Sequence, residues 1–224
     1  MAPQRSDDEE WSDLHGGVQP SPVVRGWLRM IRVLASGPII RIPPDALSVA
    51  GVVALAAAWG AVAGPGWPAL VVPLVLLAGV LDGLDGAVAL RTGRARPLGA
   101  VVDSVADRVG DVLLGAVLVA IGAPPGWALA AVSLVFLLEY VRARAQAVGM
   151  PGVGAVTVAE RPTRLIVVAM AAGGAAASPA GLPLLGWGWG VTFAVTWTAV
   201  GVVGMGQLLL GVRRSTPKDF PRPQ

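Results

Sequence analysis

Four aspartates lie close together within apolar sequence, and their spacing is that of helix faces. Asp82 and Asp85 are three residues apart, and Asp103 and Asp107 are four apart. Residues at these separations share one face of a helix, and ionisable groups in membrane-like sequence usually face a partner, a cavity or an ion. Paired carboxylates without a nearby His or Cys predict a site for Mg²⁺ or Mn²⁺ rather than for zinc.

A site of this kind suits chemistry at a diphosphate. A divalent cation can bridge phosphate oxygens and neutralise developing charge, and a carboxylate beside it can take the proton of an attacking hydroxyl. The residues alone therefore predict displacement at a lipid-linked diphosphate. They do not name the nucleotide or the lipid.

The elements that must position these aspartates are predicted to be membrane helices. Hydrophobic residues make up 54% of the 224 residues and charged residues only 14%, against about 25% charged in soluble domains. Six apolar segments, each close to the ~20 residues needed to span a bilayer, cover 46–63, 68–91, 98–121, 126–147, 162–178 and 187–211. Residues 22–36 place Arg opposite Val, Trp and Leu, which predicts an amphipathic helix in the membrane interface; an ordinary surface helix is the alternative.

We therefore expect an all-α integral membrane protein with six transmembrane helices and an N-terminal amphipathic interfacial helix. With the N-terminus in the cytoplasm, all 17 Lys and Arg residues fall on or near the cytoplasmic side, and the opposite loops near 64–67, 122–126 and 178–187 carry no charge. This asymmetry follows the positive-inside rule. It predicts a multi-pass plasma-membrane protein with both termini cytoplasmic.

The remaining composition limits the other classes of function. Basic residues flank apolar runs, so we expect no nucleic-acid partner, and the absence of Cys excludes a disulfide framework or a thiolate site. Residues 1–20, which contain His15 as the only histidine, are predicted to be a disordered acidic tail. Residues 21–212 form the expected membrane domain, and 213–224 a basic tail.

The aspartate region resembles the signature of the CDP-alcohol phosphatidyltransferases. The run Asp82-x2-Asp85-Gly86-x2-Ala89, followed by Gly99-x3-Asp103-x3-Asp107, matches seven of the eight fixed positions of that signature, and Leu90 stands where the family has Arg. The resemblance extends over about residues 44–164, including Pro44-Asp45-Ala46-Leu47-Ser48. It implies transfer of a phosphatidyl group from CDP-diacylglycerol to a small polar or phosphorylated alcohol, release of CMP, membrane lipid partners and a homodimer.

The resemblance also implies roles for individual residues. Metal ligands would be Asp82, Asp85, Asp103 and Asp107, and Asp107 would also be the general base. Close approach of the cytidine nucleotide would need the small residues of the signature, and a neighbouring Arg could replace the one missing at Leu90. The residues expected to bind CDP-diacylglycerol are Asp45, Gly86, Ala89, Arg91 and Arg96.

Two further stretches, 140–145 and 160–166, resemble the phosphatidylinositol-phosphate synthase branch of that family. The resemblance implies that Arg142, Arg144, Arg161 and Arg164 bind the phosphate of an inositol phosphate acceptor. That branch has Lys at the position of Arg142 and an Arg late in the last helix, where this chain has Gln207. Glycerol 3-phosphate (a phosphatidylglycerophosphate synthase), an unphosphorylated alcohol, or a catalytically silent relative therefore stay as alternatives.

Two other classes use aspartates within membrane helices. A membrane prenyltransferase would carry two well-separated Asp-rich motifs, which the spacing of Asp82 to Asp107 opposes. A cation transporter would need polar positions toward the far face, and the outer halves of these segments are almost purely apolar. Asp111 continues the face of Asp103 and Asp107, and we interpret it as a partner for Arg108 or a polar group within the bundle.

Overall fold

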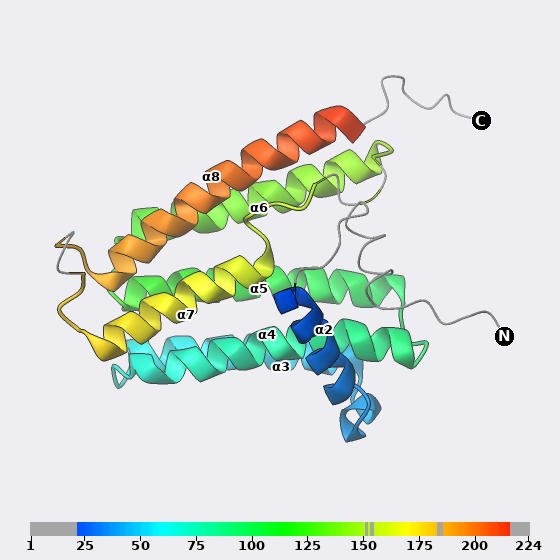
Figure 1. Ribbon diagram of the computed structural model, residues 1–224, viewed down its shortest axis with the longest axis horizontal. Coiled ribbons are helices and arrows are strands. Elements are labelled where there is room, and N and C mark those ends of the chain that lie inside the picture. The colour runs from blue at the N-terminus through cyan, green and yellow to red at the C-terminus, as the bar shows by residue number, and fades with distance from the viewer. Residues whose placement is uncertain (1–21, 151, 153–154, 183–185, 216–224) are drawn as a thin grey trace.

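The computed structural model describes residues 22–150, 152, 155–182 and 186–215 (Figure 1). These residues form seven α-helices, and their only β-type pairing is an isolated bridge between Leu182 and Trp187. The predicted tail containing His15 lies outside the described residues. The helices are α2 (Pro22–Leu34), α3 (Pro44–Ala63), α4 (Pro68–Arg91), α5 (Pro97–Ala120), α6 (Pro125–Ala147), α7 (Arg161–Ala177) and α8 (Trp189–Ser215), with a 3-10 helix η1 (Pro38–Arg41) before α3.

All six apolar segments are helices, and their bounds lie within a few residues of those predicted. Four of them, α3, α4, α6 and α8, are long and apolar enough to cross a membrane. The other two differ from these four: α7 has 17 residues, and α5 carries the four charged residues Asp103, Asp107, Arg108 and Asp111. The structure thus gives an all-helical chain with four candidate spans, and the expected amphipathic segment forms α2.

Proline and glycine set the helix ends that bring the aspartate pairs together. Proline occupies the first position of α3, α4, α5 and α6, where its missing N–H costs no hydrogen bond. After α4, Gly93 adopts a φ of 64° and donates to the Leu90 carbonyl, while the Arg94 N–H donates to the Ala89 carbonyl at 2.9 Å. This Schellman ending reverses the chain, so α5 runs antiparallel to α4 and packs mainly against α3.

The helices pack as an up-and-down bundle. Helix α3 lies against α4 and α5, α7 against α4 and α8, and α6 against α8 (Figure 1). Fully buried Leu55, Val75, Leu118, Val168 and Trp197 form part of the main core. Because the helices alternate in direction, the α4–α5 and α6–α7 connections lie at the same end of the bundle. The aspartates of α4 and α5 lie near this end.

Helix α2 crosses the bundle over α4 (Figure 1). Ile31 is buried in a small cluster with Leu47, Leu84 and Val88, which come from α3 and α4. Gly83 leaves the space that this contact needs, since a Cβ there would lie 3.0 Å from the Ile31 side chain. The N-terminal helix is therefore seated on the same stretch of α4 that carries Asp82 and Asp85.

Candidate metal and phosphate site

Three of the four predicted ligands converge at one end of the bundle. Carboxylate oxygens of Asp82, Asp85 and Asp103 all lie within 4.8 Å of one another. Asp85 is buried, and its oxygens accept hydrogen bonds from the Ser48 hydroxyl of α3 at 2.5 Å and from the Gly86 N–H at 2.6 Å. Oxygen donors without nitrogen or sulfur fit a hard divalent cation such as Mg²⁺ or Mn²⁺.

Ser48 is a site residue that sequence reasoning did not assign. It fixes one oxygen of Asp85 from a third helix, which restricts the carboxylate to one orientation. Its only sequence signal was its place in the Pro44–Ser48 stretch that resembles the family, and in that stretch Asp45 was the residue that could equally be only a helix cap. The contact of Ser48 with Asp85 depends on the packing of α3 on α4.

Asp107 lies outside this group of three and pairs with an arginine instead. A terminal nitrogen of Arg161, the first residue of α7, contacts Asp107 Oδ1, and Arg161 Nε lies 3.0 Å from Asp82 Oδ1. Arg161 therefore bridges α4 and α5 at the edge of the aspartate group. Gly110 lies beside this guanidinium and beside Leu55, since a Cβ there would be 3.5 Å from Arg161 Nη2 and 3.0 Å from Leu55 Cδ1.

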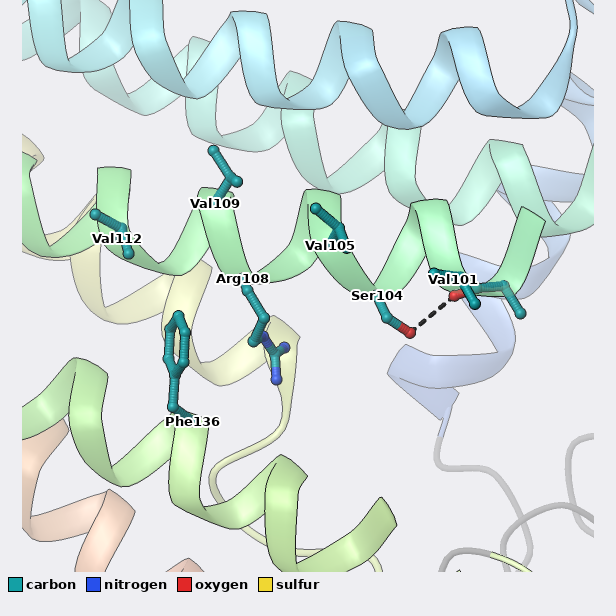
Figure 2. A pocket seen from close by; sticks show the side chains of 8 residues that line it. Val101, Ser104, Val105, Arg108, Val109, Val112 and Phe136 are labelled. Atoms are coloured by element: carbon teal, nitrogen blue, oxygen red, sulfur yellow. Dashed lines mark hydrogen bonds between the residues drawn. The ribbon is translucent and has the colours of Figure 1, made fainter. Parts of the chain in front are cut away.

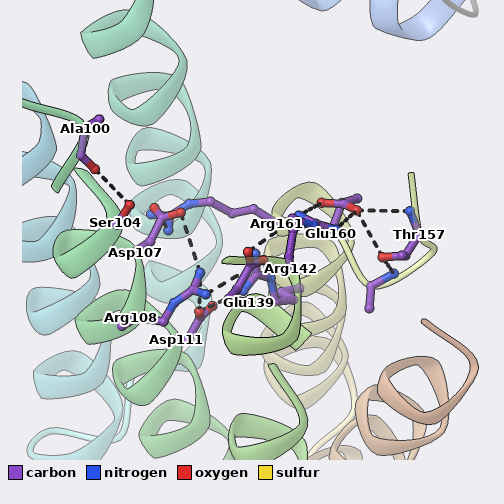
Figure 3. Close-up of polar contacts among 12 residues, drawn as sticks. Ala100, Ser104, Asp107, Arg108, Asp111, Glu139, Arg142, Thr157, Glu160 and Arg161 are labelled. Carbon is purple, nitrogen blue, oxygen red and sulfur yellow. Dashed lines mark hydrogen bonds and ion pairs between the residues drawn. The ribbon is translucent and has the colours of Figure 1, made fainter. Parts of the chain in front are cut away.

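A network of charged residues extends from Asp107 and Arg161 further into the bundle (Figure 3). Arg108 Nη2 lies 3.6 Å from Asp107 and 3.1 Å from Asp111, and Arg164 Nη1 donates to Asp111 at 2.7 Å. Asp111 is 0% exposed and Arg164 only 2%. The interpretation of Asp111 as a partner for Arg108 is confirmed, and Arg164, expected at the acceptor phosphate, is placed in a buried ion pair.

The other expected acceptor arginines lie at the α6–α7 connection. Arg142 donates to Glu160 at 2.8 Å and lies 3.5 Å from Glu139 (Figure 3). Arg144 is exposed and has no ion pair within the described part of the chain. Sequence reasoning missed both glutamates as partners, since nothing in the spacing 139, 142 and 160 shows that a loop folds back onto α6.

Glu160 is held firmly in its ionised form. Its Oε1 accepts hydrogen bonds at 3.0 Å from both the N–H and the hydroxyl of Thr157. Burial acts to raise the pKa of Glu160, but the Thr157 N–H and the Arg142 guanidinium outweigh it, so the pKa lies below its usual value. Glu160 therefore stays a carboxylate at neutral pH and keeps Arg142 in place.

The residues expected to bind CDP-diacylglycerol fall into two places. Gly86 is exposed beside Asp85, and a Cβ added to it would meet no atom within 4 Å, so the face of α4 that carries Gly86 is open. Ala89, one turn later, is half-buried. Asp45 and Arg96 form an ion pair of 2.5 Å and line a pocket of about 380 Å³ with Arg94.

The missing signature arginine has two possible substitutes, and the structure separates them. Leu90 is 71% exposed and points away from the core. Arg91 donates to the Arg32 carbonyl of α2 at 2.8 Å, so it anchors the N-terminal helix. Arg96 lies in the pocket beside Asp45, and is the better placed of the two to reach a ligand there.

An apolar groove of about 570 Å³ runs along the outer face of α5 (Figure 2). It is lined by valines of α5 and by Phe136 of α6, with Ser104 and Arg108 as its polar members. The Arg108 guanidinium carbon lies 5.9 Å from the centre of the Phe136 ring, within the range of a cation–π contact. Arg108 thus separates this apolar groove from the charged network behind it.

Comparison with known proteins agrees with this geometry. The sequence pattern of the CDP-alcohol phosphatidyltransferases matches residues 41–205. The chain is 31% identical over 225 residues to the phosphatidylinositol phosphate synthase of Mycobacterium marinum, which covers 90% of this chain and 89% of that one. It is also 37% identical over 111 residues to the archaetidylinositol phosphate synthase of Aeropyrum pernix, a match that spans 48% of this chain and about half, 55%, of that relative.

Solved structures give the same result. The crystal structure of Mycobacterium tuberculosis phosphatidylinositol phosphate synthase with CDP-DAG bound superimposes with a TM-score of 0.67 at 25% identity, covering 88% of this chain and 99% of that one. The same protein in complex with manganese and citrate also gives 0.67 at 25% identity, covering 87% and 93%. The chain belongs to the CDP-alcohol phosphatidyltransferases, a family of membrane enzymes of phospholipid biosynthesis.

Proposed function

We propose that this protein transfers the phosphatidyl group of CDP-diacylglycerol to an inositol phosphate and releases CMP. The observation that carries the proposal is the group of Asp82, Asp85 and Asp103, whose oxygens lie within 4.8 Å of one another beside the open face of Gly86. The resemblance to relatives named for phosphatidylinositol phosphate synthesis supports the acceptor. A bound Mg²⁺ or Mn²⁺ would neutralise charge on the diphosphate oxygens and orient the two reacting groups.

Different residues would have different roles in this reaction. Asp82, Asp85 and Asp103 would hold the cation, with Asp107 as a further ligand. The acceptor hydroxyl oxygen attacks the phosphatidyl phosphorus, the bond from that phosphorus to the CMP oxygen breaks, and Asp107 takes the hydroxyl proton. Gly86 and Ala89 would let the nucleotide approach α4, while Asp45 and Arg96 would border it, with Arg91 acting indirectly through α2.

The acceptor would be bound at the α6–α7 end of the bundle. Arg142, Arg144 and Arg161 lie on this side, and guanidinium groups match phosphate oxygens in geometry and charge. The environment of Arg164, buried with Asp111, supports an indirect role in which it holds the start of α7 in place. A second candidate acceptor is glycerol 3-phosphate, because Gln207 bonds the Val158 N–H and supplies no cation to this pocket.

We also propose that all six long helices cross the plasma membrane and that α2 lies in its cytoplasmic interface. Although α5 carries four charged residues, it has 24 residues, about 36 Å of helix. Its Asp111 faces the bundle, while Val105 and Val112 are more than half exposed. Exposed Trp67, Trp127 and Trp187 lie at the uncharged end, as in an aromatic belt. The homodimer and the tail boundaries at 20 and 213 stay predictions.

The test is CMP release by the purified full-length protein from CDP-diacylglycerol and Mg²⁺. The acceptors compared would be inositol 3-phosphate, glycerol 3-phosphate, free inositol, serine and phosphatidylglycerol. We expect release with inositol 3-phosphate and a loss of at least about a hundredfold in Asp103→Ala, since one ligand carboxylate disappears. Release only with glycerol 3-phosphate would change the acceptor, and no release with any acceptor would contradict the proposed reaction.

A further inference from the structure

Helix α2 packs on the bundle through only one of its faces. Ile31 is buried against Leu84 and Val88 of α4. Trp27, one turn earlier, lies beside the same helix, since a Cβ at Gly83 would be 3.6 Å from Trp27 Nε1 and 3.0 Å from Ile31 Cδ1. These contacts account for one face of α2 and leave side chains exposed on two further faces.

The two remaining faces of α2 differ in polarity. At about 100° per residue, Met30, Val33 and Leu34 share one side of the helix, and all three are exposed. Arg25 and Arg29 lie on the adjacent side; both are exposed, and neither has an ion pair within the part of the chain that the structure describes. A helix with neighbouring apolar and basic faces fits the boundary between the acyl chains and the head groups of a leaflet.

The charge of the basic face selects the kind of lipid. A zwitterionic leaflet can cover Met30 and Val33, but it offers no net negative charge to Arg25 and Arg29. Each basic residue held at a membrane surface favours anionic lipids by about fivefold, and here two arginines lie on adjacent turns of one helix. We propose that the α2 surface of Arg25, Arg29, Met30, Val33 and Leu34 binds anionic phospholipids of the cytoplasmic leaflet, and that this contact holds α2 against α4.

The place where α2 packs connects this surface to the aspartate group. Its contacts fall on Gly83 and Leu84, which lie between Asp82 and Asp85 in the sequence. Arg91, the last residue of α4, donates to a backbone carbonyl in the last turn of α2 at 2.8 Å. Displacement of α2 would therefore loosen the turn of α4 that orients two of the three clustered aspartates. This step rests on the proposed function, and it makes anionic phospholipid, the class to which the proposed product belongs, an activator of the enzyme.

The lipid surface can be tested without any measurement of activity. The full-length chain has no Cys, so a fluorophore can be attached to Gly26→Cys, an exposed position of α2 where an added Cβ meets no atom within 4 Å. In phosphatidylcholine nanodiscs, spin-labelled phosphatidylserine should quench this fluorophore several-fold more than the same fraction of spin-labelled phosphatidylcholine. Arg25→Gln with Arg29→Gln should remove the difference. Arg213→Gln with Arg214→Gln is the matched control, because it removes two exposed arginines from the end of α8, and it should keep the difference.

The link to the aspartates is tested by CMP release in phosphatidylcholine nanodiscs with and without phosphatidylserine. We expect phosphatidylserine to raise the rate several-fold in the wild type and in the α8 control, and to have no effect in the α2 double variant. Ile31→Ala should keep the selective quenching but lose the stimulation. Equal quenching by the two lipids in the protein with both α2 arginines would overturn the lipid surface, and equal stimulation of the α2 double variant would overturn its link to the site. Selective quenching without CMP release in any lipid would reject the proposed function and support the lipid surface.

Discussion

At the scale of single residues, the site combines charges that are costly to bury with partners that compensate them. Asp111 and Arg164 are the extreme case, since they are 0% and 2% exposed and bond each other at 2.7 Å. A buried ion pair adds little stability over an apolar pair, but removal of one partner leaves the other charge uncompensated. The pair therefore fixes the relation between α5 and α7, and with it the position of Arg161 one turn earlier.

We expect Asp111→Leu to lower the free energy of unfolding by about 3 to 5 kcal/mol, because Arg164 is then buried without its carboxylate. The measurement is thermal or denaturant unfolding of the purified protein in one detergent. The matched control is the double variant Asp111→Leu with Arg164→Met, which removes both charges and should recover most of the loss. A single variant as stable as the wild type, or a double variant worse than the single, would contradict this account.

At the scale of elements, α8 supports the loop that carries Glu160. Gly204 packs against Ala159, so closely that a Cβ at Gly204 would lie 2.6 Å from the Ala159 Cβ. Three residues later on the same face, Gln207 accepts a hydrogen bond at 2.8 Å from the Val158 N–H. The last helix therefore supports, through Gly204 and the uncharged Gln207, the loop that lies on the side proposed for the acceptor.

Gly204→Ala should displace this loop and raise the KM for the acceptor several-fold, with little change in the KM for CDP-diacylglycerol. The reason is steric, since the new methyl group meets the Ala159 side chain and the loop must move with Glu160 and Arg142. Gly206→Ala is the matched control, because a Cβ there meets no atom within 4 Å and alanine favours the helix. Steady-state kinetics of both variants with both substrates give the answer, and equal KM values for the acceptor in the two variants would contradict it.

The elements themselves could be predicted from the sequence almost completely, but the partners within the site could not. Apolar run length and Pro or Gly at the turns are local signals, so the six long helices begin and end within a few residues of the expected places. The contacts of Arg161 with Asp82 and Asp107, and of Ser48 with Asp85, depend on how distant helices pack. Spacing within one helix fixes which residues share a face, and it does not specify which face of another helix lies opposite.

At the scale of the whole molecule, the two ends of the bundle differ in charge. The aspartate group, the arginines and α2 lie at one end, whereas the loops at the other end contain no charged residue. Exposed apolar side chains on the outer faces of α5 and α7, including Val105, Val112, Ile166 and Met170, connect these ends. This distribution is the one expected for a bundle that spans a bilayer with its polar site at the cytoplasmic surface.

The orientation in the membrane can be tested directly because the chain has no Cys. A single Cys at Gly126, which is exposed at the uncharged end and has no neighbour within 4 Å of an added Cβ, should react with a membrane-impermeant maleimide added to intact cells. A single Cys at Ala95, exposed between α4 and α5, is the control and should react only after the cells are opened. Labelling of both from outside would place the aspartates at the wrong surface, and labelling of Ala95→Cys alone would invert the topology. The expected pattern puts α2, the proposed metal ligands and the proposed acceptor arginines at the cytoplasmic surface.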